Sequence, residues 1–92
     1  MIKSFKHKGL RELFESGKSK RIPADFAPRL LRQMDAMNQA DAPEQLNFPG
    51  YDSHELRGER AGSWALKVNK NWRLTFRFEG RDAADLDLED YH

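Results

Sequence analysis

The sequence has 92 residues, with 16 Lys and Arg, 15 Asp and Glu, three His and a formal net charge of +1 at pH 7. This length suffices for one domain with a single hydrophobic core. Because the sequence contains no cysteine, it excludes a disulfide framework and a cysteine-ligated zinc site. No segment is apolar enough for a secretory signal or a membrane span, so we expect a cytoplasmic protein without membrane contact.

The charges are distributed unevenly along the chain. Residues 1–23 contain seven Lys or Arg against two Glu, whereas residues 82–92 contain five acidic residues and no Lys or Arg. Residues 57–81 are again basic. A polyanion such as a nucleic acid could bind the basic segments. A solvated surface with local ion pairs explains the same pattern, so charge alone leaves both interpretations open.

The first part of the chain predicts a short strand over residues 2–5 and then a helix over residues 8–16. Leu10 and Leu13 have the spacing of one helix face, which should turn both toward the core. Gly17 suits the left-handed residue that commonly follows the last turn of a helix.

A second helix is predicted to begin at an N-cap Asp25, whose side chain can accept a hydrogen bond from a backbone N–H of the first turn. Pro28 would then lie in this turn, where its missing N–H costs no helical hydrogen bond. We expect the helix to end near residues 39–41 and residues 42–46 to add one short turn. Its apolar stripe has a spacing typical of core packing and consists of Phe26, Leu30, Met34 and Met37.

The second half of the chain predicts an antiparallel sheet. Residues 63–68 and 72–78 alternate apolar and polar side chains, which is the pattern of half-buried strands. Pairing Val68 with Trp72 keeps the apolar side chains of both strands on one face of the sheet. A shift of one residue in the register would move every apolar side chain of one strand to the other face. Residues 69–71 then form a three-residue loop, in which an Asn is expected in the left-handed conformation.

Residues 84–92 alternate again and should pair with the strand over residues 72–78. His54 and Leu56 suggest one further short strand. The predicted fold is therefore α+β, with two N-terminal helices packed on an antiparallel sheet of about four strands. The expected pairs between the last two strands are Leu74 with Leu88, Phe76 with Leu86, Arg73 with Glu89, and Arg77 with Asp85.

A group of polar residues that the sheet could bring together suits RNA cleavage. Cleavage without a metal ion needs a base for the 2′-hydroxyl, an acid for the leaving 5′-oxygen and cations for the charge on the phosphate. His and Asp suit proton transfer, Arg suits phosphate binding, and Tyr can stack on a base. The candidates are His54, Arg57, Arg60, Arg73, Asp90, Tyr91 and His92.

The candidates other than His54 also have purely structural interpretations. Arg73 could simply pair with Glu89 across the sheet. His92 stands at a chain end of the kind that usually frays. The other candidates would then cap the sheet edge, cover the core or lie as solvated charges in a loop, namely Asp90, Tyr91, Arg57 and Arg60.

Three segments together resemble the HigB toxins of the RelE/ParE superfamily. They are LRGERAGSW at residues 56–64, VNKNWRLTF at residues 68–76 and EDYH at residues 89–92. The opening residues also match, so the similarity covers essentially the whole chain. The resemblance implies one RelE/HigB-like toxin domain over residues 1–92, with the RelE-like microbial RNase fold, that belongs to a bacterial type II toxin–antitoxin system.

The resemblance further implies a ribosome-dependent endoribonuclease that cuts mRNA in the A site without cofactor or metal and so inhibits translation. Its expected partners are a HigA-type antitoxin, the 70S ribosome with its mRNA, and operator DNA only through the antitoxin. Two alternatives stay open. One is a ParE-like toxin that binds DNA gyrase without cutting RNA. The other is an inactive relative that acts only as an antitoxin-bound co-repressor.

The family's active-site positions carry over to residues of this chain. Arg73 would stabilise the phosphate, and Tyr91 would contact a base. Arg57 would act electrostatically, because arginine has a pKa too high for easy proton transfer. The candidates for proton transfer are Asp90, His92 and His54, with acid and base not distinguished. The basic residues expected to meet ribosomal RNA or antitoxin are Lys18, Lys20, Arg21, Arg60, Lys67 and Lys70.

Overall fold

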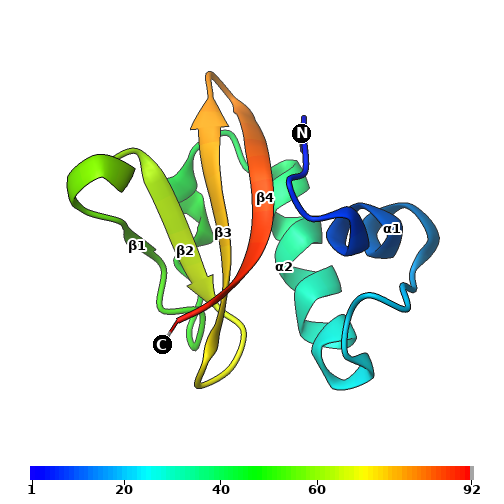
Figure 1. The fold of residues 1–92 in the computed structure, drawn as a ribbon. Coiled ribbons are helices and arrows are strands. Elements are labelled where there is room, and N and C mark those ends of the chain that lie inside the picture. Colours follow the sequence, from blue (N-terminus) through cyan, green and yellow to red (C-terminus); the bar gives the residue numbers. More distant parts are fainter. Residues whose placement is uncertain (92) are drawn as a thin grey trace.

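Two helices cover one face of a four-stranded antiparallel sheet in the computed structural model, which describes residues 1–91 (Figure 1). This architecture confirms the predicted α+β fold. The strands lie in the sheet in chain order. The elements are α1 (Lys8–Ser16), η1 (Ala24–Phe26), α2 (Ala27–Gln39), η2 (Pro43–Leu46), β1 (His54–Glu55), η3 (Gly58–Arg60), β2 (Ser63–Lys67), β3 (Trp72–Glu79) and β4 (Asp82–Asp90), where η marks a 3-10 turn.

Helix α1 begins and ends where the sequence predicts. The N-cap is His7, whose Nδ1 accepts a hydrogen bond from the Leu10 N–H at 3.3 Å. Gly17 has a φ of 84° and its N–H donates to the Leu13 oxygen at 2.8 Å, which closes the last turn. Leu10 and Leu13 are fully buried. Within residues 1–91 no helix is long and apolar enough to cross a membrane.

Helix α2 has its N-cap at Phe26, one residue later than the sequence predicts. Residues 24–26 form a 3-10 turn that runs directly into the helix, so the side chain of Asp25 does not cap it. The turn itself occupies the first backbone donor, because the Ala27 N–H donates to the Ala24 oxygen. Pro28 still lies in the first turn, as predicted. The predicted apolar stripe is confirmed, with Leu30, Met34 and Met37 fully buried and Phe26 packed against the core.

Strands β2 and β3 pair in the predicted register, and the Val68 N–H donates to the Trp72 oxygen at 3.0 Å. The expectation of a left-handed Asn in the loop is wrong, because no residue among 69–71 has a positive φ. Instead, Asn69 Oδ1 accepts hydrogen bonds from the N–H groups of Asn71 and Trp72, each at 2.9 Å. This side-chain turn closes the loop without the left-handed conformation.

The pairing of β3 with β4 contains a bulge that the alternation does not predict. After Thr75 the register shifts, so Arg77 lies opposite Ala84 and not opposite Asp85. The expected charge pair still forms, because Arg77 Nε donates to Asp85 Oδ2 at 2.6 Å. Asp85 has a φ of 56°, and β4 has one residue more than β3 across the shift. Of the remaining expected pairs, Leu74 with Leu88 and Arg73 with Glu89 are confirmed, whereas Phe76 with Leu86 is lost to the bulge.

Ser4 fills this bulge. The Asp85 N–H donates to Ser4 Oγ at 2.9 Å, and the Leu86 N–H donates to the Ser4 oxygen at 3.3 Å. The N-terminal segment thereby satisfies backbone donors that the bulge has removed from the sheet. The predicted strand over residues 2–5 is reduced to two isolated parallel bridges, Ile2 with Ala83 and Phe5 with Leu86.

The two faces of the sheet differ as the alternation predicts. Leu66, Leu74 and Phe76 point toward the helices and are buried in the core. In Figure 1 the helices lie behind the sheet and beside it, so no helix covers its front face. The side chains of the central strands on that face include Lys67, Arg73, Thr75 and Arg77.

Candidate active site

A hollow of about 240 Å³ opens on the face of the sheet that the helices leave uncovered. Its innermost residues are the small, buried Ala65 and Thr75. It brings together four of the sequence-predicted site residues, which come from η3, β3 and the end of β4. The complete lining is Leu56, Arg60, Ala65, Arg73, Thr75, Glu89, Asp90 and Tyr91.

Arg73 is the buried cation of this hollow, with 8% of its surface exposed. Its Nη1 donates to the backbone oxygens of Asn69 at 2.8 Å and Trp72 at 3.1 Å. Its guanidinium carbon lies 4.2 Å from the centroid of the Tyr91 ring. Its Nε is buried without a hydrogen-bond partner among residues 1–91. The hollow is therefore lined by a fixed positive charge, and the buried Nε of the same side chain is an unpaired donor among residues 1–91.

Glu89 lies directly opposite Arg73 in the sheet, yet its carboxylate binds other side chains. Arg60 donates to both carboxylate oxygens, from Nη1 to Oε1 at 2.8 Å and from Nη2 to Oε2 at 2.6 Å. Thr75 Oγ1 donates to Oε2 at 2.5 Å. The hydrogen bonds from Arg60 hold the pKa of Glu89 below its ordinary value, although partial burial acts the other way. Arg73 and Glu89 are therefore neighbours in the sheet but not an ion pair, so the purely structural interpretation of Arg73 is wrong.

Tyr91 and Asp90 follow each other at the end of β4 and both line the hollow. The Tyr91 N–H donates to the Asn71 oxygen at 2.6 Å, which fixes the backbone beside the hairpin loop. The residue is 56% exposed and its ring rests on Arg73, so it does not cover the core. The last candidate, His92, lies outside the described residues.

His54 and Arg57 lie near the hollow but do not line it. His54 pairs with Ala65 in the sheet, so its side chain stands on the same face as the hollow. Its Nδ1 lies 2.8 Å from the backbone oxygen of Asp52. This hydrogen bond selects the tautomer with the proton on Nδ1, so Nε2 of the neutral ring is an acceptor. Arg57 is exposed and directly precedes η3.

Lys67 and Lys70 lie at the hairpin between β2 and β3 and do not line the hollow. The backbone oxygen of Lys67 accepts hydrogen bonds from Arg29 Nε at 3.0 Å and Gln33 Nε2 at 2.9 Å. These contacts fix this end of β2 to α2. Lys70 is exposed in the loop. The two ammonium groups are thus carried by a hairpin that is anchored from the helical side.

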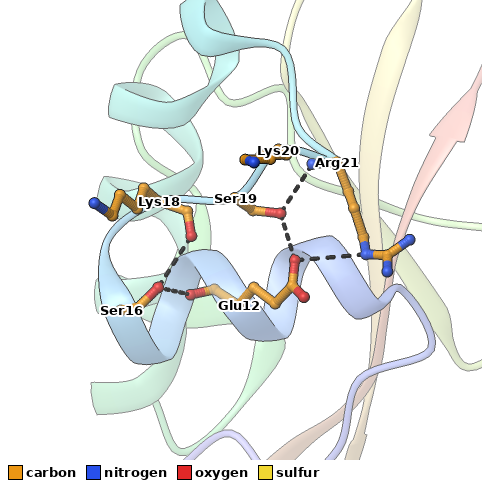
Figure 2. Close-up of a pocket in the computed structure, with 6 residues that line it drawn as sticks. All are labelled: Glu12, Ser16, Lys18, Ser19, Lys20 and Arg21. Carbon is orange, nitrogen blue, oxygen red and sulfur yellow. Dashed lines mark hydrogen bonds and ion pairs between the residues drawn. The ribbon is translucent and has the colours of Figure 1, made fainter.

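The other predicted basic residues line a second, larger hollow of about 730 Å³ beside α1 (Figure 2). Glu12 lines it from α1, and its Oε1 accepts a hydrogen bond from Ser19 Oγ at 2.7 Å and lies 3.5 Å from Arg21 Nε. The hydrogen bond from Ser19, with the nearby charge of Arg21, holds the pKa of Glu12 below its ordinary value. Arg21 is therefore paired. The residues of this hollow are Glu12, Ser16, Lys18, Ser19, Lys20 and Arg21.

Four residues of the hollow with Arg73 are absent from the sequence-predicted site. Alternation along β2 and β3 places Ala65 and Thr75 on the same face as Arg73, and two small side chains there could have indicated a depression. The sequence predicts Glu89 only as the partner of Arg73 across the sheet, and Leu56 only as part of a short strand. Within residues 1–91 no group of three or more His, Asp or Glu side chains could hold a metal ion.

Comparison with known proteins gives consistent results. The chain matches, over residues 3–92, a family model described as the RelE-like toxin of type II toxin–antitoxin system HigB. It is 46% identical over 92 residues to Endoribonuclease HigB of Proteus vulgaris, with all of both chains covered. It is 32% identical over 80 residues to Toxin HigB-1 of Vibrio cholerae serotype O1, which covers 85% of this chain and 84% of that relative.

Proposed function

The chain belongs to the HigB toxin family of type II toxin–antitoxin systems, and we propose that it is an endoribonuclease that cuts mRNA in the ribosomal A site. The observation that carries this proposal is the buried Arg73, whose Nε has no hydrogen-bond partner among residues 1–91. A guanidinium held in this way suits a phosphate, because it binds oxygen anions through fixed, charge-assisted hydrogen bonds. The name of the full-length relative Endoribonuclease HigB supports the same activity.

The proposed reaction is an internal transfer within the RNA and uses no metal ion. A base removes the proton from the 2′-hydroxyl, whose oxygen attacks phosphorus, and an acid protonates the 5′-oxygen as its bond to phosphorus breaks. The negative charge that grows on the phosphate needs a cation nearby. We assign this last role to Arg73. The candidates for the two proton transfers are Asp90, His54 and His92.

Tyr91 would contact a base of the bound RNA. One face of its ring rests on Arg73, and 56% of the residue is exposed, so a base could stack on the other face. A base stacked there would bring its own phosphate close to Arg73. Arg57 would add positive charge beside the site without transferring protons.

The ribosome would supply the positioning that this site lacks. A hollow of about 240 Å³ can hold about one nucleotide, so it cannot by itself align an extended RNA strand. Ribosomal RNA or antitoxin would contact the basic residues that lie outside the hollow. A HigA-type antitoxin would neutralise the toxin in the cytoplasm and would provide its only link to operator DNA. The basic residues concerned are Lys18, Lys20, Arg21, Lys67 and Lys70.

Primer-extension mapping of mRNA 5′ ends tests the proposal. The purified protein is added to a translating cell-free extract and, in parallel, to the same mRNA without ribosomes. We expect cuts within codons in the translated sample alone, and their loss with Arg73→Met. Arg81→Met is the matched control, because Arg81 is an exposed residue that pairs with Asp41 away from the hollow.

Two results would contradict the proposal. Intact mRNA in an extract that contains the folded wild-type protein would exclude RNA cleavage, and a gyrase supercoiling assay would then test the ParE-like alternative. Equal cutting with and without ribosomes would exclude the dependence on the ribosome.

A further inference from the structure

The carboxylate of Glu89 and the guanidinium of Arg73 occupy opposite positions of β3 and β4 but do not form an ion pair. Opposite charges that face each other across an antiparallel sheet ordinarily attract each other and pair. Both side chains also line the same hollow. The absence of this pair within the described residues therefore needs a cause.

The cause is competition from two other donors. Arg60 reaches over from η3 and binds both oxygens of Glu89 in the bidentate geometry that makes arginine–carboxylate contacts strong. Thr75 lies on β3, and its Oγ1 donates a second hydrogen bond to Oε2 of Glu89. The side chain of Glu89 is 30% exposed, so water screens this contact less than it would at the open surface. The carboxylate thus accepts three hydrogen bonds from Arg60 and Thr75, and none from Arg73.

The consequence for Arg73 is chemical. A carboxylate bound to its guanidinium would neutralise the charge that a phosphate needs and would occupy the same donors. We propose that Arg60 is a positioning residue that holds Glu89 away from Arg73 and so keeps Arg73 open to phosphate. This inference rests on the proposed function, because it explains how the phosphate-binding residue Arg73 of that site is kept free of a competing carboxylate.

The same geometry argues against direct contact between Arg60 and RNA. Both Nη atoms of Arg60 donate to Glu89, so a phosphate would have to displace a bidentate carboxylate to bind there. Residues 57–61 are otherwise exposed, and the Arg60–Glu89 contact ties their loop to β4 across the face of the hollow. The expectation that Arg60 meets ribosomal RNA is therefore replaced by a role within the protein.

The test uses inorganic phosphate as the probe and the arginine Nε–H signals of the full-length, 15N-labelled protein in NMR spectra at low salt. The Arg73 signal is identified by its loss in Arg73→Lys. The variants are Arg60→Met, which frees Glu89, and Arg60→Met combined with Glu89→Gln, which removes the competing charge. Arg81→Met is the matched control. Thermal melting of each variant verifies that it is folded.

The proposal expects the Arg73 signal to shift with phosphate in the wild-type protein and in the control. Arg60→Met should weaken this response by roughly tenfold, and the added Glu89→Gln should restore it. An unchanged response in Arg60→Met would overturn the proposal. So would a double variant that stays weak, because Arg60 would then contact phosphate itself. A wild-type Arg73 that ignores phosphate would overturn it too.

Cleavage of translated mRNA provides an independent comparison. We expect Arg60→Met to cut more slowly than the wild-type protein and the double variant to recover. If the wild-type protein does not cut mRNA although the phosphate responses follow the expected order, the proposed function is wrong and the role of Arg60 stands. If the wild-type protein cuts mRNA but Glu89→Gln does not rescue Arg60→Met, the function stands and the role of Arg60 is wrong.

Discussion

The ring of Tyr91 lies over the guanidinium of Arg73, 4.2 Å from its central carbon. A contact of this kind at an exposed site contributes about 0.5–1 kcal/mol. Tyr91→Ala should therefore lower the free energy of unfolding by about this amount and strongly reduce cleavage. Tyr91→Phe keeps the ring and should keep both properties. Urea denaturation and the cleavage assay compare the two variants, and equal losses of activity would show that the hydroxyl group matters and not the stacking.

Arg73→Lys tests whether a positive charge suffices at this position. Lysine cannot reproduce the planar fork of the guanidinium, so we expect cleavage to fall by about 10²-fold or more. The hydrogen bonds to Asn69 and Trp72 would be weakened as well, at about 1 kcal/mol each. Single-turnover cleavage measures the loss of catalysis, and thermal melting measures the loss of stability. A folded Arg73→Lys protein with full activity would contradict the assigned role.

Glu89 makes stability depend on acid pH. Its pKa is lower in the folded protein than the ordinary value of 4.5, because Arg60 and Thr75 donate to the carboxylate. The stabilising effect is therefore complete above pH 4.5 and is lost as the pH falls toward the depressed pKa. Glu89→Gln should remove this part of the acid dependence. Melting temperatures measured from pH 7 to pH 3 give the comparison, and parallel curves for wild type and Glu89→Gln would contradict it.

The side-chain turn at Asn69 should stabilise the hairpin measurably. Asn69→Ala removes an acceptor used by two backbone N–H groups, so we expect a loss of about 1–2 kcal/mol in the free energy of unfolding. Asn69→Asp keeps the acceptor and is the matched control. Because the backbone oxygen of Asn69 also holds Arg73, the alanine variant should reduce cleavage too. An alanine variant as stable as the wild type would show that the loop does not need this acceptor.

Local patterns predict much of this fold. The bounds of α1, the register of β2 with β3 and the two faces of the sheet all follow from the spacing of apolar residues and from Gly17. The bulge in β4 does not. It depends on Ser4, which lies 81 positions away from Asp85 in the sequence and has no pattern that points to it. The conformation of the loop at Asn69 does not follow from local patterns either, because Asn can close a turn with its side chain or with a left-handed backbone.

The candidate site divides in the same way. The alternation predicts that Arg73 and Glu89 face each other, and the resemblance predicts that Arg73 matters. Neither predicts that Arg60, 29 positions from Glu89, takes the carboxylate. A sequence pattern gives the face on which a side chain stands. It does not determine which of two nearby arginines, Arg60 or Arg73, binds the carboxylate of Glu89, because that depends on the geometry of the irregular loop that contains Arg60.

The N-terminal segment also bears on self-association. Strand β4 is an edge of the sheet, and an open edge offers backbone groups with which a second molecule can pair. Here the N–H and the oxygen of Ala83 bind Met1 and Lys3, and those of Leu86 bind Ser4 and Lys6. A segment too irregular to count as a strand thus occupies the first half of this edge, and its removal would expose the backbone groups of Ala83 and Leu86 to pairing with a second molecule.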